Sequence, residues 1–137
     1  GCSRYISLDS NGLNGAMVVD LNLQLSRSLG QFDLVTDFGT GEHVFDQKTV
    51  WRNVHNLTRV GGVIAFDRPC AGYEEHCYYL INQCLIADLA RDNRYEIIDL
   101  STRDMPRGRL LRGTMRRTHK NKFIVPQQGR YRKSSKL

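Results

Sequence analysis

The stretch from residue 31 to residue 64 reads QFDLVTDFGTGEHVFDQKTVWRNVHNLTRVGGVI and decides the fold. Its apolar run at 32–36 is rich in β-prone residues, and two glycines follow it closely. Residues 47–58 then repeat apolar side chains at helical spacing, and a glycine pair separates them from a second apolar run at 63–66. This order of strand, loop, helix and strand predicts one α/β unit.

The loop that follows the first of these strands carries Glu42 and His43. Ligands of open α/β sheets bind at the carboxyl ends of the strands, so this loop is where chemistry is expected. Asp46, directly before the helix, is a good N-cap residue. We therefore expect the helix to begin at residue 47 and the polar loop to lie at the ligand-binding edge.

The chain has 137 residues, of which 40% are hydrophobic, so one domain with a sizeable core is expected. No apolar run reaches the ~18 residues that a membrane span needs, and the first residues lack the order of a signal peptide. We therefore expect a cytoplasmic protein without membrane contact. The cysteines form no CxxC pair and are expected to be small buried hydrophobes, and no spacing predicts a metal site.

Charge is distributed unevenly along the chain. Residues 1–105 hold 9 Lys and Arg against 14 Asp and Glu, whereas residues 106–137 hold 11 Lys and Arg and no acid. A basic segment on an acidic body is typical of proteins that bind a polyanion such as nucleic acid. A solvated edge strand followed by a soluble tail explains the same charges, and the sparse aromatic residues of the segment favour that explanation.

The remaining elements follow from apolar periodicity and turn residues. The alternation of apolar and polar residues at 110–117 is typical of an antiparallel strand near a sheet edge. Irregular structure is expected from residue 120 onward. The other expected elements are strands at 4–8, 16–19 and 95–100 and helices at 21–29 and 76–91.

The order of several short segments along the chain is informative about the fold. YISLD ends at residue 9, VVDLN at residue 22, and FDLVTD at residue 37; EHVFD, a helix and LTRVGGVIAF come next, and LLRGTMRRT comes last. This order resembles the class I S-adenosylmethionine-dependent methyltransferases, in which acidic residues end the second and third strands. The resemblance implies an α/β fold: a Rossmann-like three-layer sandwich with a mostly parallel sheet and an antiparallel last strand.

The resemblance assigns residues 1–119 to a partial methyltransferase-like domain and residues 120–137 to a basic C-terminal tail. The family's glycine-rich turn after its first strand has no counterpart in this sequence, so we expect the first strand and helix to be missing. Buried unpaired backbone groups cost about 1 to 3 kcal/mol each. The gap that the missing strand leaves in the sheet would then have to be filled by preceding residues, by closure of the neighbouring strands, or by another chain such as a second copy.

The same resemblance implies S-adenosylmethionine as the cofactor. Asp9 is expected to accept hydrogen bonds from the ribose hydroxyls, and Asp20, with the Leu21 backbone, to contact the adenine. Asp37 and Gly39 are expected to shape the rim around the cofactor. Asp9 could instead begin the following turn, and Asp20 could cap a helix, because both roles suit aspartate.

Glu42 and His43 are the expected catalytic residues. His43 could remove a proton from an acceptor oxygen or nitrogen. Tyr73 and His76, which follow the strand at 63–66, are expected to contact the methyl acceptor. A surface histidine and a polar loop that caps a helix explain the same residues, and both explanations stay open here.

Methyl transfer to an unidentified acceptor is therefore the expected function, impaired in this chain because the glycine-rich loop is absent. The alternative is a non-catalytic methyltransferase-like module, held on RNA by its basic C-terminal segment. A nicotinamide-dependent oxidoreductase shares the early pattern of strand and acid. It fits the EHV loop and the late antiparallel strand less well, and it also requires a glycine-rich turn.

Overall fold

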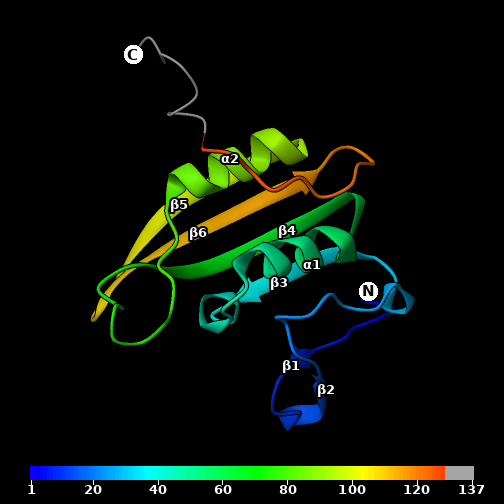
Figure 1. The fold of residues 1–137 in the computed structure, drawn as a ribbon, viewed down its shortest axis with the longest axis horizontal. Coiled ribbons are helices and arrows are strands. Elements are labelled where there is room, and N and C mark those ends of the chain that lie inside the picture. The colour runs from blue at the N-terminus through cyan, green and yellow to red at the C-terminus, as the bar shows by residue number, and fades with distance from the viewer. Residues whose placement is uncertain (129–137) are drawn as a thin grey trace.

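A four-stranded sheet with the strand order β3-β4-β6-β5 carries the domain (Figure 1). The structure is a computed structural model and describes residues 1–128. Two α-helices connect the strands: α1 (Gln47–Leu57) links β3 to β4, and α2 (Gln83–Asn93) links β4 to β5. The long strands are β3 (Phe32–Phe38), β4 (Thr58–Ala71), β5 (Tyr95–Met105) and β6 (Gly108–Arg117).

Three of these strands run in one direction and β6 runs in the other. β3 and β4 pair in parallel, whereas β6 pairs antiparallel with both β4 and β5. The α/β fold with an antiparallel last strand, as predicted from the sequence, is therefore present. All four of these strands lie where the sequence predicted them, and β4 and β5 are longer than expected.

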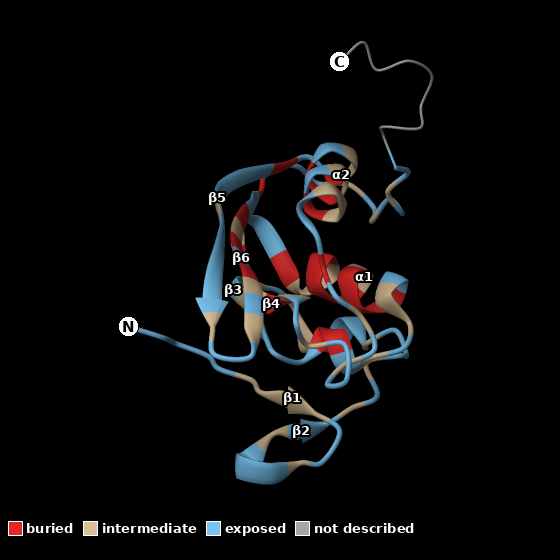
Figure 2. Cartoon of the chain, turned by 90° about the vertical axis from the view of Figure 1, so that its left-hand side faces the viewer, coloured by how far each residue is buried: buried red, intermediate tan, exposed pale blue. Residues whose placement is uncertain are grey.

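Both helices pack on the same face of the sheet (Figure 2). Each crossover advances in the same direction along the sheet, and right-handed crossovers of one direction place their helices on one side. Residues 1–128 thus form two layers, and the expected three-layer sandwich is wrong for this part of the chain. Neither helix of the described chain is long and apolar enough to cross a membrane.

α1 begins where expected because Asp46 caps it. The Asp46 carboxylate accepts hydrogen bonds from the Thr49 backbone N–H at 2.9 Å and from the Thr49 hydroxyl at 2.7 Å. Trp51 and Val54 reach from the helix into the core. There Trp51 meets the fully buried ring of Phe66 edge to face, with centroids 5.9 Å apart. This contact holds α1 against β4.

The N-terminal strands are shorter than predicted and form a sheet of their own. β1 (Leu8–Asp9) and β2 (Met17–Val18) pair in parallel, apart from the four-stranded sheet. The strands expected at 4–8 and 16–19 are thus correct in place and too long in extent. Both residues of β2 are exposed, so little burial is available to extend the pairing.

The helix predicted at 21–29 does not form, and only Arg27–Leu29 make a turn of 3-10 helix. Contacts from α1 hold the backbone in an open conformation instead. The Asn53 side chain donates to the Leu23 carbonyl at 2.9 Å and accepts from the Leu25 N–H at 3.0 Å. These tertiary hydrogen bonds replace the helical ones that the leucine spacing suggested.

α2 starts later than the helix predicted at 76–91. Asn82 caps it by accepting a hydrogen bond from the Leu85 N–H at 2.9 Å. The residues before Asn82 form a loop, and Cys77 therefore lies in a loop rather than on a helix. The capping asparagine interrupts an apolar spacing that continues on both sides of it, which is why periodicity alone extended the helix too far.

All four cysteines are free thiols. Cys2 is exposed and the other three are half-buried. They are thus less buried than the sequence predicted.

Residues 120–128 have no regular secondary structure, as predicted, yet part of this segment packs against the domain. The Asn93 side chain, at the end of α2, donates to the Ile124 carbonyl at 2.9 Å and accepts from the Ile124 N–H at 2.8 Å. Phe123 packs against the core. The packed chain therefore continues past residue 119. Residues 129–137, the rest of the expected basic tail, lie outside the described residues.

Candidate active site

The loop after β3 is a tight turn held by a buried aspartate. Gly39 has a φ of +77°, a left-handed conformation that glycine adopts readily. The Gly41 N–H donates to Asp37 Oδ1 at 2.8 Å, and a Cβ at position 41 would lie only 2.5 Å from Asp37 Oδ2. The turn therefore needs glycine, and it delivers Glu42 and His43 to the carboxyl edge of the sheet.

A buried arginine lies beneath this turn. Arg68 of β4 is 1% exposed, with Nη1 3.6 Å from Asp37 Oδ2 and Nε 3.5 Å from Glu42 Oε2. Its Nη2 donates to Gln47 Oε1 at 2.8 Å. Burial lowers the pKa of Arg68, and the two carboxylates oppose that shift. This charge cluster of Asp37, Glu42 and Arg68 ties the turn and the start of α1 to β4.

The charge cluster determines what Glu42 can do. Its side chain is only 2% exposed, and its Oε1 lies 4.0 Å from His43 Nε2. Glu42, which the sequence suggested as a catalytic residue, therefore lies beneath His43 and does not face solvent. Its position is that of a support for the histidine.

His43 and His76 meet above the charge cluster. Their rings pack edge to face with centroids 5.0 Å apart, and the Tyr73 ring lies 5.9 Å from that of His76. The side chain of His43 is 42% exposed, so one part of the ring is open to a ligand. The structure thus brings together three candidate site residues that the sequence placed in two separate loops.

A hollow of about 430 Å³ lies beside the two histidines. Sites for small molecules commonly have this size. Burial raises the pKa of the Cys77 thiol, and the nearby Glu42 raises it further, so this thiol stays protonated near neutral pH. The residues that line the hollow are His43, Glu74, Glu75, His76, Cys77 and Tyr78.

Three aromatic residues at this edge were not singled out by the sequence. The rings of Phe45, Tyr78 and Tyr79 lie 6.4 Å from one another. The Tyr79 N–H donates to the Glu42 carbonyl at 3.2 Å and the Tyr79 hydroxyl to the Phe45 carbonyl at 3.0 Å, which joins the two loops. Adjacent tyrosines in a polar stretch were the available signal, but the helix predicted over 76–91 concealed it.

Asp9 and Asp20 both make local turns. Asp9 Oδ1 accepts from the Asn11 N–H at 3.0 Å, and Asp20 Oδ1 accepts from the Asn22 N–H at 2.8 Å. Aspartate commonly makes such turns with its own backbone. Asp20 precedes no α-helix, so the alternative role of helix cap is wrong for this residue. The second oxygen of each carboxylate takes part in none of the hydrogen bonds among residues 1–128.

A chain of contacts places these two residues near the histidine loop. The Val19 N–H donates to the Asp9 carbonyl at 2.9 Å, which sets the ends of β1 and β2 side by side. Two residues after Asp20, the Asn22 side chain accepts from the Asp46 N–H at 2.9 Å. Asp46 caps α1, so the two strand ends lie at the edge of the domain where α1 begins.

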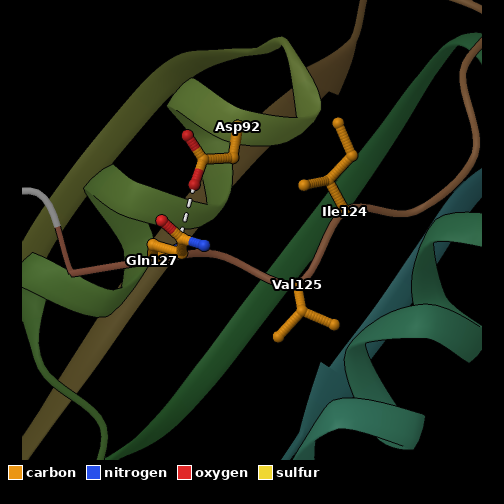
Figure 3. Close-up of a pocket in the computed structure, with 4 residues that line it drawn as sticks. All are labelled: Asp92, Ile124, Val125 and Gln127. Atoms are coloured by element: carbon orange, nitrogen blue, oxygen red, sulfur yellow. Dashed lines mark hydrogen bonds between the residues drawn. The ribbon is translucent and has the colours of Figure 1, made fainter.

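A second hollow, of about 270 Å³, lies where the C-terminal segment crosses α2 (Figure 3). It is lined by Asp92, Ile124, Val125 and Gln127, and the Gln127 N–H donates to Asp92 Oδ2 at 3.1 Å. None of the expected site residues lines it. No three His, Cys, Asp or Glu side chains of residues 1–128 lie close enough together to hold a metal ion.

Two solved structures with a similar fold are methyltransferases. One is the 1,6-didemethyltoxoflavin-N1-methyltransferase of Burkholderia thailandensis, crystallised with 1,6-didemethyltoxoflavin and S-adenosylhomocysteine bound. It shares 18% sequence identity, with 76% of this chain and 51% of that protein covered and a TM-score of 0.59. Another is the N-methyltransferase NodS of Bradyrhizobium japonicum WM9, at 12% identity, 76% and 60% coverage and a TM-score of 0.57. No family model and no curated protein sequence matches the chain.

The chain thus shares its fold with part of each of these two methyltransferases. The chain spans about half the length of the Burkholderia protein and about three fifths of NodS. The resemblance inferred from the order of short sequence segments is thus confirmed at the level of the fold. At such low identity the roles of individual residues rest on the geometry of this chain.

Proposed function

We propose that this chain forms part of an S-adenosylmethionine-dependent methyltransferase and seats the methyl acceptor. The meeting of His43, Tyr73 and His76 at the carboxyl edge of a methyltransferase-type sheet carries this proposal. That edge is where open α/β sheets bind their ligands. An acceptor in the adjoining hollow would contact both histidines directly.

S-adenosylmethionine would supply a methyl group on a sulfonium, and four residues have suitable chemistry to hold it. Asp9 and Asp20 each keep one carboxylate oxygen free for hydroxyl or amino groups of an adenosyl moiety. We assign the ribose to Asp9 and the adenine to Asp20 and the Leu21 backbone. A Cβ at Gly39 would meet only Glu42 Oε1, at 3.8 Å, so a ligand has room to approach the backbone there.

Asp37 and Glu42 are proposed as positioning residues rather than as contacts of a ligand. Asp37 is 7% exposed and holds the Gly41 N–H, while Glu42 supports His43 from below. Both carboxylates depend on Arg68 for charge compensation. The buried charge cluster therefore fixes where the histidine ring stands.

His43 is the proposed base. An acceptor must present a lone pair to an electrophilic methyl group, so an acceptor that is protonated at that lone pair has to lose the proton first. Histidine exchanges protons readily near neutral pH, and the His43 ring is partly open to the hollow. Methyl transfer depends mainly on holding the two reactants in line, a task for Tyr73 and His76 in this proposal.

Titration of S-adenosylhomocysteine into the 137-residue chain, followed by calorimetry, tests the proposal. We expect saturable binding that Asp9→Ala weakens about tenfold or more, the loss of a charge-assisted hydrogen bond of ~1.5 kcal/mol or above. Asp99→Ala, which removes an exposed acid from the middle of β5, on the opposite side of the sheet from β3, is the matched control. Absence of saturable binding, or equal affinity in the two variants, would overturn the assignment.

Nucleic-acid binding through the basic segment has less support. Arg109, Arg112 and Arg116 pair with Asp104, Asp67 and Glu96, and Arg117 donates to backbone carbonyls inside the domain. These arginines are largely engaged within the fold. Salt-sensitive RNA binding in the absence of any S-adenosylhomocysteine binding would favour the alternative, a non-catalytic interaction module.

A further inference from the structure

Exposed aromatic rings gather around Tyr78, one of the residues that line the hollow beside His43. Phe45 is 73% exposed and Tyr78 is 71% exposed, although their rings contact each other and that of Tyr79. Large exposed aromatic rings that gather at one place mark ligand or partner sites. The rings of His43, His76 and Tyr78 line the hollow, so it offers a ligand several ring faces and edges.

The accessible charge at this hollow is negative. Glu74 and Glu75 line it, and none of its lining residues is Lys or Arg. Arg68, which contacts the turn that carries His43, is 1% exposed and is compensated by Asp37 and Glu42. A ligand in the hollow therefore meets carboxylates and the negative faces of aromatic rings.

We propose that the hollow binds a protonated amine carried on a flat aromatic group, and that this amine is the methyl acceptor. This inference rests on the proposed methyltransferase function. Aromatic rings attract an ammonium group by about 0.5 to 2 kcal/mol, and a neighbouring carboxylate adds to that attraction. The aromatic portion packs against Tyr78 and Phe45, and the ammonium group lies between Glu75 and the histidine pair.

His43 completes the site, because an ammonium nitrogen has no lone pair to offer. The N–H bond of the bound ammonium breaks, its electron pair stays on nitrogen as the lone pair, and the proton forms a new N–H bond on the imidazole of His43. The amine that remains is neutral and nucleophilic, whereas a carboxylic acid or an alcohol would gain little from the acids at the rim.

Three probes of nearly equal shape test the class of ligand: 2-phenylethylamine, 2-phenylethanol and phenylacetate, each titrated into the 137-residue chain and followed by two-dimensional NMR. We expect the amine to bind about tenfold more tightly than the alcohol, as ~1.4 kcal/mol of cation recognition predicts, and phenylacetate to bind most weakly. Shifts should centre on residues 43–45 and 73–79. Equal binding of the amine and the alcohol, or preferred binding of phenylacetate, would overturn the proposal.

Two variants assign the effect to the hollow. Glu75→Gln should weaken binding of 2-phenylethylamine several-fold and leave binding of 2-phenylethanol unchanged, whereas Tyr78→Leu should weaken both. Asp99→Asn removes the same charge from β5, at the opposite edge of the sheet, and should change neither affinity; equal effects of Glu75→Gln and Asp99→Asn would contradict the assignment. Unchanged melting curves confirm that each variant is folded.

These titrations need no cofactor, so they separate the two proposals. Amine binding without S-adenosylhomocysteine binding would support the proposed ligand class of the hollow and contradict the methyltransferase function. If the chain binds S-adenosylhomocysteine but prefers the neutral or anionic probe, the methyltransferase function is supported and the amine is contradicted as the methyl acceptor.

Discussion

The imidazole rings of His43 and His76 meet edge to face, at 82° and with centroids 5.0 Å apart, although they belong to loops that follow two different strands. Parallel pairing of β3 with β4 brings those two loops to one edge of the sheet.

Replacing His43 should slow methyl transfer far more than it weakens acceptor binding. Loss of a general base commonly costs about 10² to 10⁴ in rate. In a cofactor-loaded preparation, His43→Gln should therefore lower kcat for S-adenosylhomocysteine formation by at least about 10², while the affinity for 2-phenylethylamine changes little. His76→Leu should mainly raise KM. If His43→Gln raises KM and leaves kcat intact, the histidine holds the acceptor and is no base.

Replacing Arg68 should destabilise the domain severely. Arg68→Met leaves the Asp37 and Glu42 carboxylates buried without their cation, and breaking such a pair costs about 3 to 5 kcal/mol. Arg103→Met is the matched control, because Arg103 is half-exposed and its contact with Asp67 is worth at most about 1 kcal/mol. Urea unfolding measures both. Similar losses in the two variants would show that the charge cluster does not hold the turn.

Protonation of His55 should lower the stability of the domain below pH 6.5. His55 is fully buried, with Nδ1 2.6 Å from the Tyr95 hydroxyl and Nε2 2.9 Å from the Asn121 carbonyl. Burial lowers the pKa of His55 below its ordinary value of 6.5, and the Arg117 charge lowers it further, against the Asn121 carbonyl, which raises it.

The unfolded chain therefore binds a proton at His55 before the folded chain does, so the free energy of unfolding falls as the pH drops below 6.5. Above that pH the contribution of this group is complete and constant. Urea unfolding between pH 5 and 7.5 checks this, with His55→Gln as the reference. The variant should show a flatter profile over this range, and parallel profiles would refute the prediction.

The free edge of β3 is proposed to pair with another chain. Within residues 1–128, β3 pairs only with β4, and Leu34 is 55% exposed. An exposed apolar edge strand favours association. We expect analytical ultracentrifugation to show dimers that increase with concentration and disappear in Leu34→Lys. Leu23→Lys, at a residue 63% exposed but outside the strands, should not change them. A monomer at all concentrations would exclude pairing between copies.

Local signals in the sequence predicted the unit from β3 to β4 well. Asp46 caps α1, glycines shape the turn after β3, and both strands contain runs of β-prone residues. The rule that ligand-binding loops follow parallel strands placed His43, Tyr73 and His76 at one edge without any knowledge of their contacts. These predictions rest on local chemistry and on one topological rule, so they did not depend on distant contacts.

The remaining features depend on contacts that no local pattern reveals. The segment at 21–29 has helical leucine spacing, but Asn53 of α1 holds it open. Nothing in the neighbourhood of Arg68 marks it as buried, and Glu42 looked catalytic because its burial could not be read from its position. Phe45 and Tyr78 gather only because the loop before α2 is not helical.

The most direct test of the account is a titration of the ¹⁵N-labelled chain with S-adenosylhomocysteine, observing the backbone of 39–43 and the ring signals of His43 and His76. A cofactor that occupies the proposed site must shift Gly39 and both histidines together, with one dissociation constant, and must do so less in Asp9→Ala. Shifts that avoid these residues, or that centre on the second hollow at Asp92 and Ile124, would contradict the central claim.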